Sequence, residues 1–293
     1  MGGFKAPGED GFPTVFYQQN WEVVGHSVIK FIEELWRNPE KIGEINKTLL
    51  VLIPKVEQPE KVSQFKPIAL CNVLYKGLSK LLVNRLKPFM DDLVSPYQTS
   101  FVPGRSIHDN KIIAKEVIHS MSKLQGKKGF MIVKIDLEKA YDRMSWKFIG
   151  RVLEEIGLPD QLWKVIMECM TSIKMSLLWN ENRRQGFVPT RGLRQGDPLS
   201  PYLFVLGMEK LSHLITNCVQ SRKWKAMRME RNRIEVSHLL FADDLLLICE
   251  ADIDSICTVM RVLEVFGEAS GQKVNPQKTS IFFFTKCGEE SAK

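Results

Sequence analysis

The 293-residue chain has only six cysteines, and no two of them form a Cys-x-x-Cys pair. Their spacing argues against a zinc finger and against a disulfide-stapled secreted scaffold, so reduced thiols are expected. No apolar run approaches the ~18 residues of a membrane span. The first ten residues, MGGFKAPGED, contain no apolar core of a signal peptide. These absences predict a soluble, intracellular protein without a membrane partner.

Apolar content and charge are sufficient for a folded protein that binds an anion. Hydrophobic residues make up 44% of the chain and charged residues 26%, so a substantial core can form. The formal net charge is +7 and the pI is about 9.0. This excess of positive charge favours nucleic acid as a partner over a membrane surface.

Apolar periodicity predicts helices interspersed with strands. Helical spacing occurs in the ranges 21–35, 74–90, 109–123, 146–156, 161–178 and 253–269, and another helix is expected to start near residues 200–201. Strand patterns occupy 49–54, 130–137 and 279–284, a buried hairpin is predicted at 238–248, and a basic hairpin-like insertion at 222–233. This mixed order predicts an α+β fold with a largely antiparallel sheet.

Three carboxylates stand inside apolar, strand-like runs: Asp136, Asp243 and Asp244. Burying a carboxylate is costly unless a cation or a basic side chain compensates it. Clustered hard oxygen ligands suit Mg²⁺ better than zinc. Two such ions ~4 Å apart would stabilise the attacking and leaving oxygens of a phosphoryl displacement. Taken one at a time, each aspartate is equally compatible with a cap or a surface ion pair.

Six segments provide the context that single aspartates lack. In chain order they are LIPKVEQPEKVSQFKPIALCNVLYKGLSKLLVNRL, SFVPGRSIHDN, IVKIDLEKAYDR, RGLRQGDPLSP, HLLFADDLLL and SGQKVNPQKT. Their order and wording resemble the reverse transcriptase of non-LTR (LINE-type) retrotransposons, most closely plant elements, over almost the whole chain. The resemblance implies a polymerase right hand with fingers and palm and without a thumb. It implies an N-terminal extension of the fingers at 1–48, fingers and palm at 49–284, and a tail at 285–293.

The resemblance also implies an enzyme, an RNA-directed DNA polymerase. Asp136 and Asp243 would bind two catalytic Mg²⁺ ions, with Mn²⁺ as a substitute, and Asp244 would complete the carboxylate set. The primer 3′-hydroxyl would attack the α-phosphate of an incoming dNTP, with an RNA template and a DNA primer as partners. Because adjacent strand residues point to opposite faces, we expect Asp243 to be a more direct ligand than Asp244.

Further positions match the family's substrate-binding motifs. Tyr141 stands at the steric-gate position, where an aromatic ring crowds a ribose 2′-hydroxyl, and a core aromatic residue is the less favoured alternative. Gln195 and Gly196 match the loop that faces template and dNTP, although Gly-Asp-Pro also suits an ordinary turn.

Three lysines match positions near the nucleotide phosphates. Lys55 and Lys66 correspond to the fingers segment that contacts dNTP phosphates, and Lys278 to a lysine that assists pyrophosphate release. The family usually has arginine at the position of Lys66, and lysine keeps the charge but loses the bidentate fork. Lys278 is equally compatible with a solvated surface side chain.

Two other functions are compatible with the same motifs. One is a catalytically silent retroelement remnant that only binds nucleic acid, and the other is a group II intron-type maturase with the same fold. The three aspartates, the aromatic gate and the Gln-Gly loop are all intact, which favours polymerase activity, weakened by the missing thumb. Such an enzyme is expected in the nucleus and cytoplasm, and the sequence does not indicate its oligomeric state. The basic segment 222–233 either tracks a nucleic-acid backbone or forms a solvated face.

Overall fold

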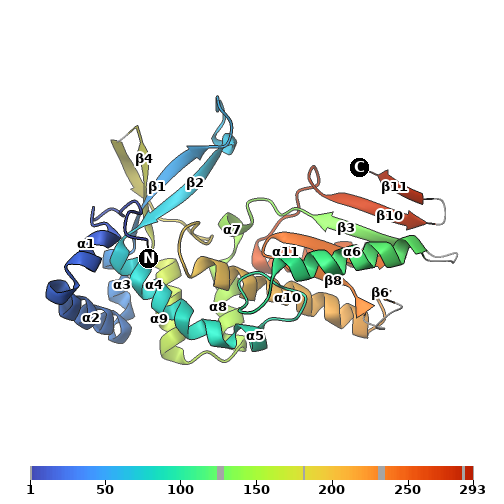
Figure 1. The fold of residues 1–293 in the computed structure, drawn as a ribbon, viewed down its shortest axis with the longest axis horizontal. Helices are drawn as coiled ribbons and strands as arrows, with labels where there is room; N and C mark the ends of the chain where they lie inside the picture. The colour runs from blue at the N-terminus through green and yellow to red at the C-terminus, as the bar shows by residue number, and fades with distance from the viewer. Residues whose placement is uncertain (1, 124–128, 181, 230–234, 286–287, 293) are drawn as a thin grey trace. The chain divides into compact units, whose positions relative to one another are not determined.

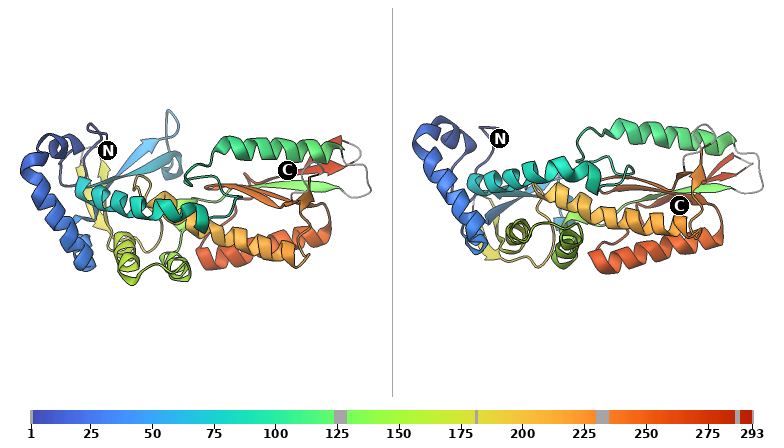
Figure 2. Two further views of the ribbon diagram at one scale, coloured as in Figure 1. Left: turned by 60° about the horizontal axis from the view of Figure 1, so that its bottom comes forward. Right: turned by 90° about the horizontal axis from the view of Figure 1, so that it is seen from below.

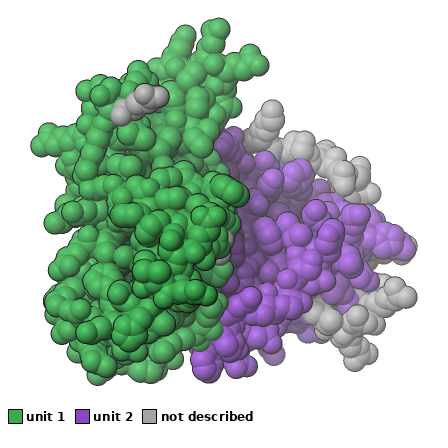
Figure 3. Space-filling view, turned by 60° about the vertical axis from the view of Figure 1, so that its left-hand side comes forward, with its two compact units in different colours: residues 1–86, 153–201 green, residues 87–152, 202–293 purple. Residues whose placement is uncertain are grey.

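The computed structural model describes all residues except 1, 124–128, 181, 230–234, 286–287 and 293. The chain forms two compact units, one of residues 1–86 and 153–201 and the other of residues 87–152 and 202–293. Figure 3 colours the two units separately. The predicted functional boundaries at residues 48 and 284 stay a prediction.

The first unit is built on a mixed four-stranded sheet with the order β2-β1-β4-β5 (Figure 1). Strand β1 pairs antiparallel with β2 and parallel with β4, and β4 pairs antiparallel with β5. The strands are β1 Lys47–Pro54, β2 Phe65–Cys71, β4 Lys174–Trp179 and β5 Asn182–Phe187. The helices are α1 Thr14–Gln19, α2 Trp21–Arg37, η1 Pro39–Lys41, α3 Ile42–Ile45, η2 Val62–Gln64, α4 Val73–Leu86 and α9 Asp160–Thr171.

The second unit contains an antiparallel five-stranded sheet with the order β11-β10-β3-β9-β8. Its strands are β3 Phe130–Ile135, β8 His238–Phe241, β9 Asp244–Glu250, β10 Ser280–Thr285 and β11 Gly288–Ala292, and a small separate ladder joins β6 Met227–Arg228 to β7 Glu235–Val236. The helices that lie mainly in this unit are η3 Lys87–Phe89, α5 Met90–Leu93, α6 Ile107–Lys123, α7 Ala140–Arg143, α8 Trp146–Glu155, α10 Ser200–Gln220 and α11 Ile253–Ser270.

Helices cover both faces of this antiparallel sheet. Figure 2 shows α6 on one face and α10 and α11 on the other. Strand β3 is apolar on both sides for this reason. Ile132 packs in a buried cluster with Val117 of α6, while Met131 and Val133 point to the opposite face and are also buried. The resulting layered core holds the ends of β3, β8 and β9, where the predicted carboxylates lie.

The predicted α+β architecture and most of its elements are confirmed, with one clear error. The range 161–178 is not a single helix, because α9 ends at Thr171 and residues 174–179 form β4. The Lys174 amide donates to the Asn46 carbonyl at 3.2 Å, and β4 continues from there in parallel with β1. This pairing joins segments distant in sequence, so local periodicity could not reveal it. Among the described residues, no helix is both long and apolar enough to span a membrane.

Candidate functional site

The three predicted carboxylates gather at one end of the antiparallel sheet. Asp136 directly follows β3, Asp243 lies in the β8–β9 turn, and Asp244 begins β9 opposite Phe241. Ile135 pairs with Leu245, so the same register brings Asp136 opposite Asp244. The expectation that these acids are buried within strands is wrong. Asp136 is half-buried and the other two are exposed, because the strands end at these residues.

The acids share an uncompensated negative field. Partial desolvation in the turn raises the pKa of Asp243, and the negative charges of Asp244 and Asp136 raise it further. No ion pair of the described residues includes any of the three. Within the described part of the chain, no group of three His, Cys, Asp or Glu side chains is arranged as a metal cage. The three carboxylates therefore lie near one another without forming a closed metal site among the described residues.

Asp136 is held by a segment that the sequence motif SGQKVNPQKT supplies. The Asn275 side-chain amide donates to Asp136 Oδ2 at 3.3 Å, and the Asn275 backbone amide donates to the Asp136 carbonyl at 2.8 Å. The Asp136 amide donates in turn to Thr279 Oγ1 at 3.4 Å. The motif is recognisable in the sequence, but the role of Asn275 was not predicted from it. The neutral amide orients the carboxylate and leaves its charge uncompensated.

Tyr141 lies beside the carboxylates on the short helix α7. Its ring stacks on buried Phe204, with centroids 4.5 Å apart and ring planes 9° from parallel. Burial, and then the charge of Asp243, raise the pKa of Tyr141 to about 12, so the hydroxyl stays protonated at neutral pH. Because Asp243 perturbs this hydroxyl, the predicted gate residue and a predicted metal ligand lie in one site. The stacked ring has a fixed plane, as a steric gate requires.

The end of α11 positions the helix that carries Tyr141. Gly271 ends α11 with φ +81°, and a Cβ there would come within 2.6 Å of the Arg143 carbonyl. The next residue, Gln272, is buried and donates from Nε2 to the Ala140 carbonyl at 2.8 Å. Only glycine allows this close approach of two backbones. The Ser270-Gly271-Gln272 segment therefore holds α7 in place through its contacts with Ala140 and Arg143.

A strand-like segment braces the hairpin that presents Asp243. The Leu240 amide donates to the Tyr97 carbonyl at 2.8 Å, and the Thr99 amide donates to the Leu240 carbonyl at 3.2 Å. Between them, the fully buried Gln98 accepts the Ala242 amide on Oε1 at 3.2 Å. Ala242 has φ +53°, a backbone conformation that residues with a Cβ rarely adopt. Gln98 is a supporting residue that sequence analysis did not single out.

A chain of buried polar groups runs behind this hairpin. His238 of β8 shares a hydrogen bond with Ser212 Oγ at 2.7 Å, Ser212 shares one with Ser95 Oγ at 2.9 Å, and Ser95 donates to Glu209 Oε2 at 3.2 Å. Burial lowers the pKa of His238 to about 3, so the ring is neutral. Burial also raises the pKa of Glu209 to about 7. Glu209 is the titratable end of this chain near neutral pH.

We expect Glu209→Gln to flatten the pH dependence of stability. The unfolded glutamate ionises at its ordinary value of 4.5, whereas the folded one stays protonated up to about pH 7. Stability therefore falls as pH rises through this window, by about 3 kcal/mol in all, and is constant above it. Urea unfolding at pH 5 and pH 8 measures the difference. Glu264→Gln, an exposed carboxyl on α11, is the matched control. An equal pH slope in wild type and Glu209→Gln would contradict the assignment.

In the first unit, the two fingers lysines lie on opposite arms of one hairpin. Lys66 of β2 pairs with Ile53 of β1, and Lys55 follows the end of β1, where its amide donates to the Gln64 carbonyl at 2.8 Å. Both side chains are exposed. Lys55 Nζ donates to the Ser63 carbonyl at 3.3 Å, and no acid pairs with either lysine among the described ion pairs. The structure thus brings these two positions together.

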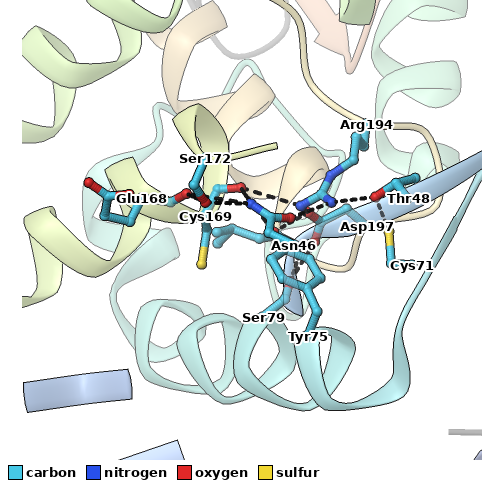
Figure 4. A network of polar contacts seen from close by, with 11 residues as sticks. Asn46, Thr48, Cys71, Tyr75, Ser79, Glu168, Cys169, Ser172, Arg194 and Asp197 are labelled. Atoms are coloured by element: carbon cyan, nitrogen blue, oxygen red, sulfur yellow. Dashed lines mark hydrogen bonds and ion pairs between the residues drawn. The ribbon is translucent and has the colours of Figure 1, made fainter. Parts of the chain in front are cut away.

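Gln195 and Gly196 lie between Arg194 and Asp197. These two flanking residues form a buried ion pair that was not predicted from the sequence. Arg194 Nη2 lies 2.9 Å from Asp197 Oδ2, and both side chains are almost fully buried (Figure 4). Arg194 Nη1 also donates to Asn46 Oδ1 at 2.7 Å and to Thr48 Oγ1 at 2.9 Å, and Nη2 donates to the Cys169 carbonyl at 3.3 Å. An arginine and an aspartate three residues apart in RQGD were the available signal.

Asp197 closes the same network against α4. It accepts hydrogen bonds from the Tyr75 hydroxyl at 2.7 Å, from Ser79 Oγ and from the Leu199 amide at 3.0 Å (Figure 4). The Arg194 guanidinium also stacks over the Tyr75 ring at 4.1 Å. A buried ion pair is tolerated when its remaining hydrogen-bonding capacity is used in this way.

The Arg194–Asp197 network fixes the backbone of the loop that contains Gln195 and Gly196. The Ala69 amide of β2 donates to the Gln195 carbonyl at 3.0 Å. Gly196 has φ +110°, and a Cβ there would lie 2.9 Å from the Ala69 carbonyl, so the position requires glycine. The Gln195 side chain remains partly exposed and Gly196 is exposed. The backbone of the loop at Gln195 and Gly196 is therefore held in one conformation by its contacts with Ala69, while the Gln195 side chain remains accessible to solvent.

Two other predicted features are Lys278 and the basic segment 222–233. Lys278 is exposed, in the turn that starts at Asn275, where its amide donates to the Asn275 carbonyl at 3.3 Å. In the basic segment 222–233, the pairing of β6 and β7 confirms a hairpin-like ladder, although residues 230–234 lie outside the described residues. Lys225 pairs with Glu250 and Asp252, and Arg228 with Glu235, so part of the positive charge is neutralised within the chain.

A comparison with protein families identifies the chain. The family described as reverse transcriptase (RNA-dependent DNA polymerase) matches residues 53–291. The chain belongs to this family. Its reverse transcriptase domain includes every predicted site residue, from Lys55 to Lys278.

Relatives of this reverse transcriptase domain are mobile-element proteins. The transposon TX1 uncharacterized 149 kDa protein of Xenopus laevis is 25% identical over 276 residues, 94% of this chain and 20% of that protein. The retrovirus-related Pol polyprotein from type-2 retrotransposable element R2DM of Drosophila melanogaster is 29% identical over 229 residues, 78% of this chain and 20% of that protein. The chain thus spans about a fifth of the length of these relatives. They confirm the resemblance to non-LTR elements and favour it over a maturase.

A solved structure supports the fold of the reverse transcriptase domain. Telomerase from Candida albicans, determined in complex with a TWJ fragment of telomeric RNA, superposes with a TM-score of 0.53 at 16% identity. The match covers 92% of this chain and 46% of that chain. At this identity the likeness concerns the fold alone. It agrees with the α+β architecture predicted from the sequence.

Proposed function

We propose that this chain is the RNA-directed DNA polymerase core of a non-LTR retrotransposon. The observation that carries the proposal is the uncompensated set of Asp136, Asp243 and Asp244 beside stacked Tyr141, in a domain that belongs to the reverse transcriptase family. The antiparallel sheet of the second unit would be the palm, and the sheet of the first unit the fingers. RNA template, DNA primer and dNTPs are the proposed partners, and the nucleus and cytoplasm the proposed compartments.

The three carboxylates are the proposed holders of the catalytic cations. Their charges repel one another, and no basic side chain of the described ion pairs neutralises them, which fits a site that divalent cations complete. Two Mg²⁺ ions, or Mn²⁺ in their place, would supply charge stabilisation for the displacement at the dNTP α-phosphate. Asn275 keeps Asp136 oriented without adding charge. Because the turn is exposed, Asp243 and Asp244 would be accessible to a bound substrate.

The remaining residues would bind and select the substrate. Tyr141 would crowd a ribose 2′-hydroxyl, and the pinned Gln195–Gly196 loop would present a rigid surface to template and dNTP. Lys55 and Lys66, on the two arms of one hairpin, would attract the dNTP phosphates. Lys278, which is exposed, would stabilise the pyrophosphate as it leaves. Lysine at position 66 would do so as a point charge.

Primer extension tests the proposed function. The chain is incubated with a homopolymer RNA template, a complementary DNA primer, the matching dNTP and Mg²⁺. We expect extension that stops when EDTA removes the cation and that Mn²⁺ restores. A protein that binds the template–primer but never extends it, in either metal, is the silent remnant and not a polymerase.

We expect Tyr141→Ala to relax sugar selection. Removing the ring opens the space for a 2′-hydroxyl, so the ratio of kcat/KM for dNTP over rNTP should fall roughly tenfold or more. Tyr141→Phe keeps the ring and its stack on Phe204, so its ratio should equal that of the wild type. Single-nucleotide incorporation kinetics measure both. An unchanged ratio in Tyr141→Ala would make this residue a packing residue only.

A further inference from the structure

The sheet of the first unit carries a second basic site, away from the two fingers lysines. A cavity of about 270 Å³ opens beside β1, β4 and β5. It is lined by Lys47, Lys174, Ser176, Arg183, Gly186 and Phe187, together with Glu9 of the N-terminal segment. None of these residues was predicted from the sequence to have a function.

Two lysines of this cavity face each other across neighbouring strands. Lys47 pairs with Lys174 in the parallel register of β1 and β4, and both are exposed. Like charges directly opposite one another destabilise a sheet. No acid pairs with either lysine among the ion pairs of the described residues. A bound anion would relieve this repulsion.

The rest of the lining suits a phosphate group. Ser176 is the next residue but one after Lys174 and shares its sheet face, so its hydroxyl lies on the lysine side. Gly186 pairs with Ser176, and a Cβ at Gly186 would lie 3.2 Å from Ser176 Oγ. Glycine at this position therefore leaves the space beside the Ser176 hydroxyl free. The acid of the cavity, Glu9, is bound to Arg183 at 2.9 Å. The net charge of the lining is positive.

The position of the cavity favours a nucleic-acid strand over a free nucleotide. Phe187 also lines the cavity, but it pairs with Met175, so strand alternation directs its side chain to the face opposite Lys174 and Ser176. Lys66 pairs with Ile53, six residues along β1 from Lys47, which is ~20 Å at the rise of a strand. One phosphate group cannot contact both places. The cavity is thus separate from the proposed dNTP lysines.

We propose that this cavity binds a backbone phosphate of single-stranded nucleic acid. Lys47 and Lys174 supply the charge, and Ser176 donates a hydrogen bond. The proposal rests on the proposed function for its ligand class, because a polymerase core must hold an unpaired template. It does not depend on catalysis, since binding can be measured without any dNTP.

The test compares Lys47→Ala/Lys174→Ala with Lys30→Ala/Lys164→Ala. The control removes two exposed lysines from α2 and α9 of the same unit. Binding of a fluorescent oligo(U) strand is followed by anisotropy at several salt concentrations. Each lost phosphate contact lowers the slope of log K against log salt by ~0.7 for single strands, so one shared phosphate predicts a drop of ~0.7. The control slope should equal that of the wild type.

Further measurements separate the alternatives. Thermal unfolding should show the cavity variant at least as stable as wild type, because it loses a repulsive pair. Equal slopes in the two lysine variants and the wild type would overturn the proposal. A raised KM for dNTP with unchanged oligo(U) binding would also overturn it, because the phosphate would then belong to a free nucleotide. If oligo(U) binding changes as expected while no variant, nor the wild type, extends a primer, the cavity stands and the polymerase function fails.

Discussion

Asp243→Asn is expected to reduce primer extension by more than ~100-fold, since even supporting residues of metal sites cost 10–100-fold. The substitution preserves the volume of the side chain and removes one negative charge from the set that would hold the cations. It should also stabilise the folded protein. Partial burial, and then the charges of Asp244 and Asp136, raise the pKa of Asp243, so a neutral amide is easier to desolvate there and avoids their repulsion. Steady-state extension kinetics and thermal unfolding give the two readouts.

The opposite signs of these two effects make the prediction specific. Asp254→Asn, at an exposed carboxylate in the first turn of α11, removes the same charge and should leave extension unchanged. The stability gain should be present at neutral pH and should vanish at pH values low enough to protonate Asp243 in the wild type. Extension by Asp243→Asn within a few fold of wild type in Mg²⁺ would remove this residue from the proposed metal site.

Arg194→Met is expected to cost about 3–5 kcal/mol of stability, the range for removing one partner of a buried ion pair. Asp197 would keep the hydrogen bonds from Tyr75, Ser79 and Leu199 but lose the positive charge that compensates it. Arg194 also joins β1 to α9 through Thr48 and the Cys169 carbonyl. Since whole domains are stable by only ~5–15 kcal/mol, the loss should be visible as a large shift of the urea midpoint.

The matched control is Arg191→Met, three residues earlier in the same loop and exposed. It loses the same charge, and its stability should lie within ~0.5 kcal/mol of wild type. Arg194→Met/Asp197→Asn, which removes both charges, should be less destabilised than Arg194→Met alone. A double variant as unstable as the single one would mean that packing, and not the unpaired carboxylate, dominates the loss.

Much of the site was predictable from the sequence because local patterns of apolar and charged residues surround the site aspartates. The alternating pattern of 130–137 and the two apolar arms around Asp243 and Asp244 predicted the strands whose ends carry the carboxylates, and β3, β8 and β9 confirm them. The environment of the acids was predicted wrongly. Apolar neighbours in sequence suggested burial, but Asp243 in the turn and Asp244 at the start of β9 are exposed, whereas Ala242 in the same turn is buried.

The residues that support the site were not predictable, because their partners are distant in sequence. Gln98 reaches Ala242, Asn275 reaches Asp136, and Arg194 reaches Asn46. A polar residue that will be buried looks like a surface residue until its partner is known. Helix α9 shows the same limit for backbone structure, since the apolar residues after Thr171 fit a helix until β1 offers them a parallel partner.

The sequence by itself determined the reverse transcriptase motifs, the order of most helices and strands, and the identity of the charged and aromatic groups. These depend on local periodicity, turn chemistry and residue type, which a chain carries in any conformation. Only the tertiary structure decided that Asp136 lies opposite Asp244, that Tyr141 stacks on Phe204, and that the loop of Gln195 is held by a buried ion pair. Each of these depends on strand register or on long-range packing, where free energy is gained between segments that local sequence cannot relate.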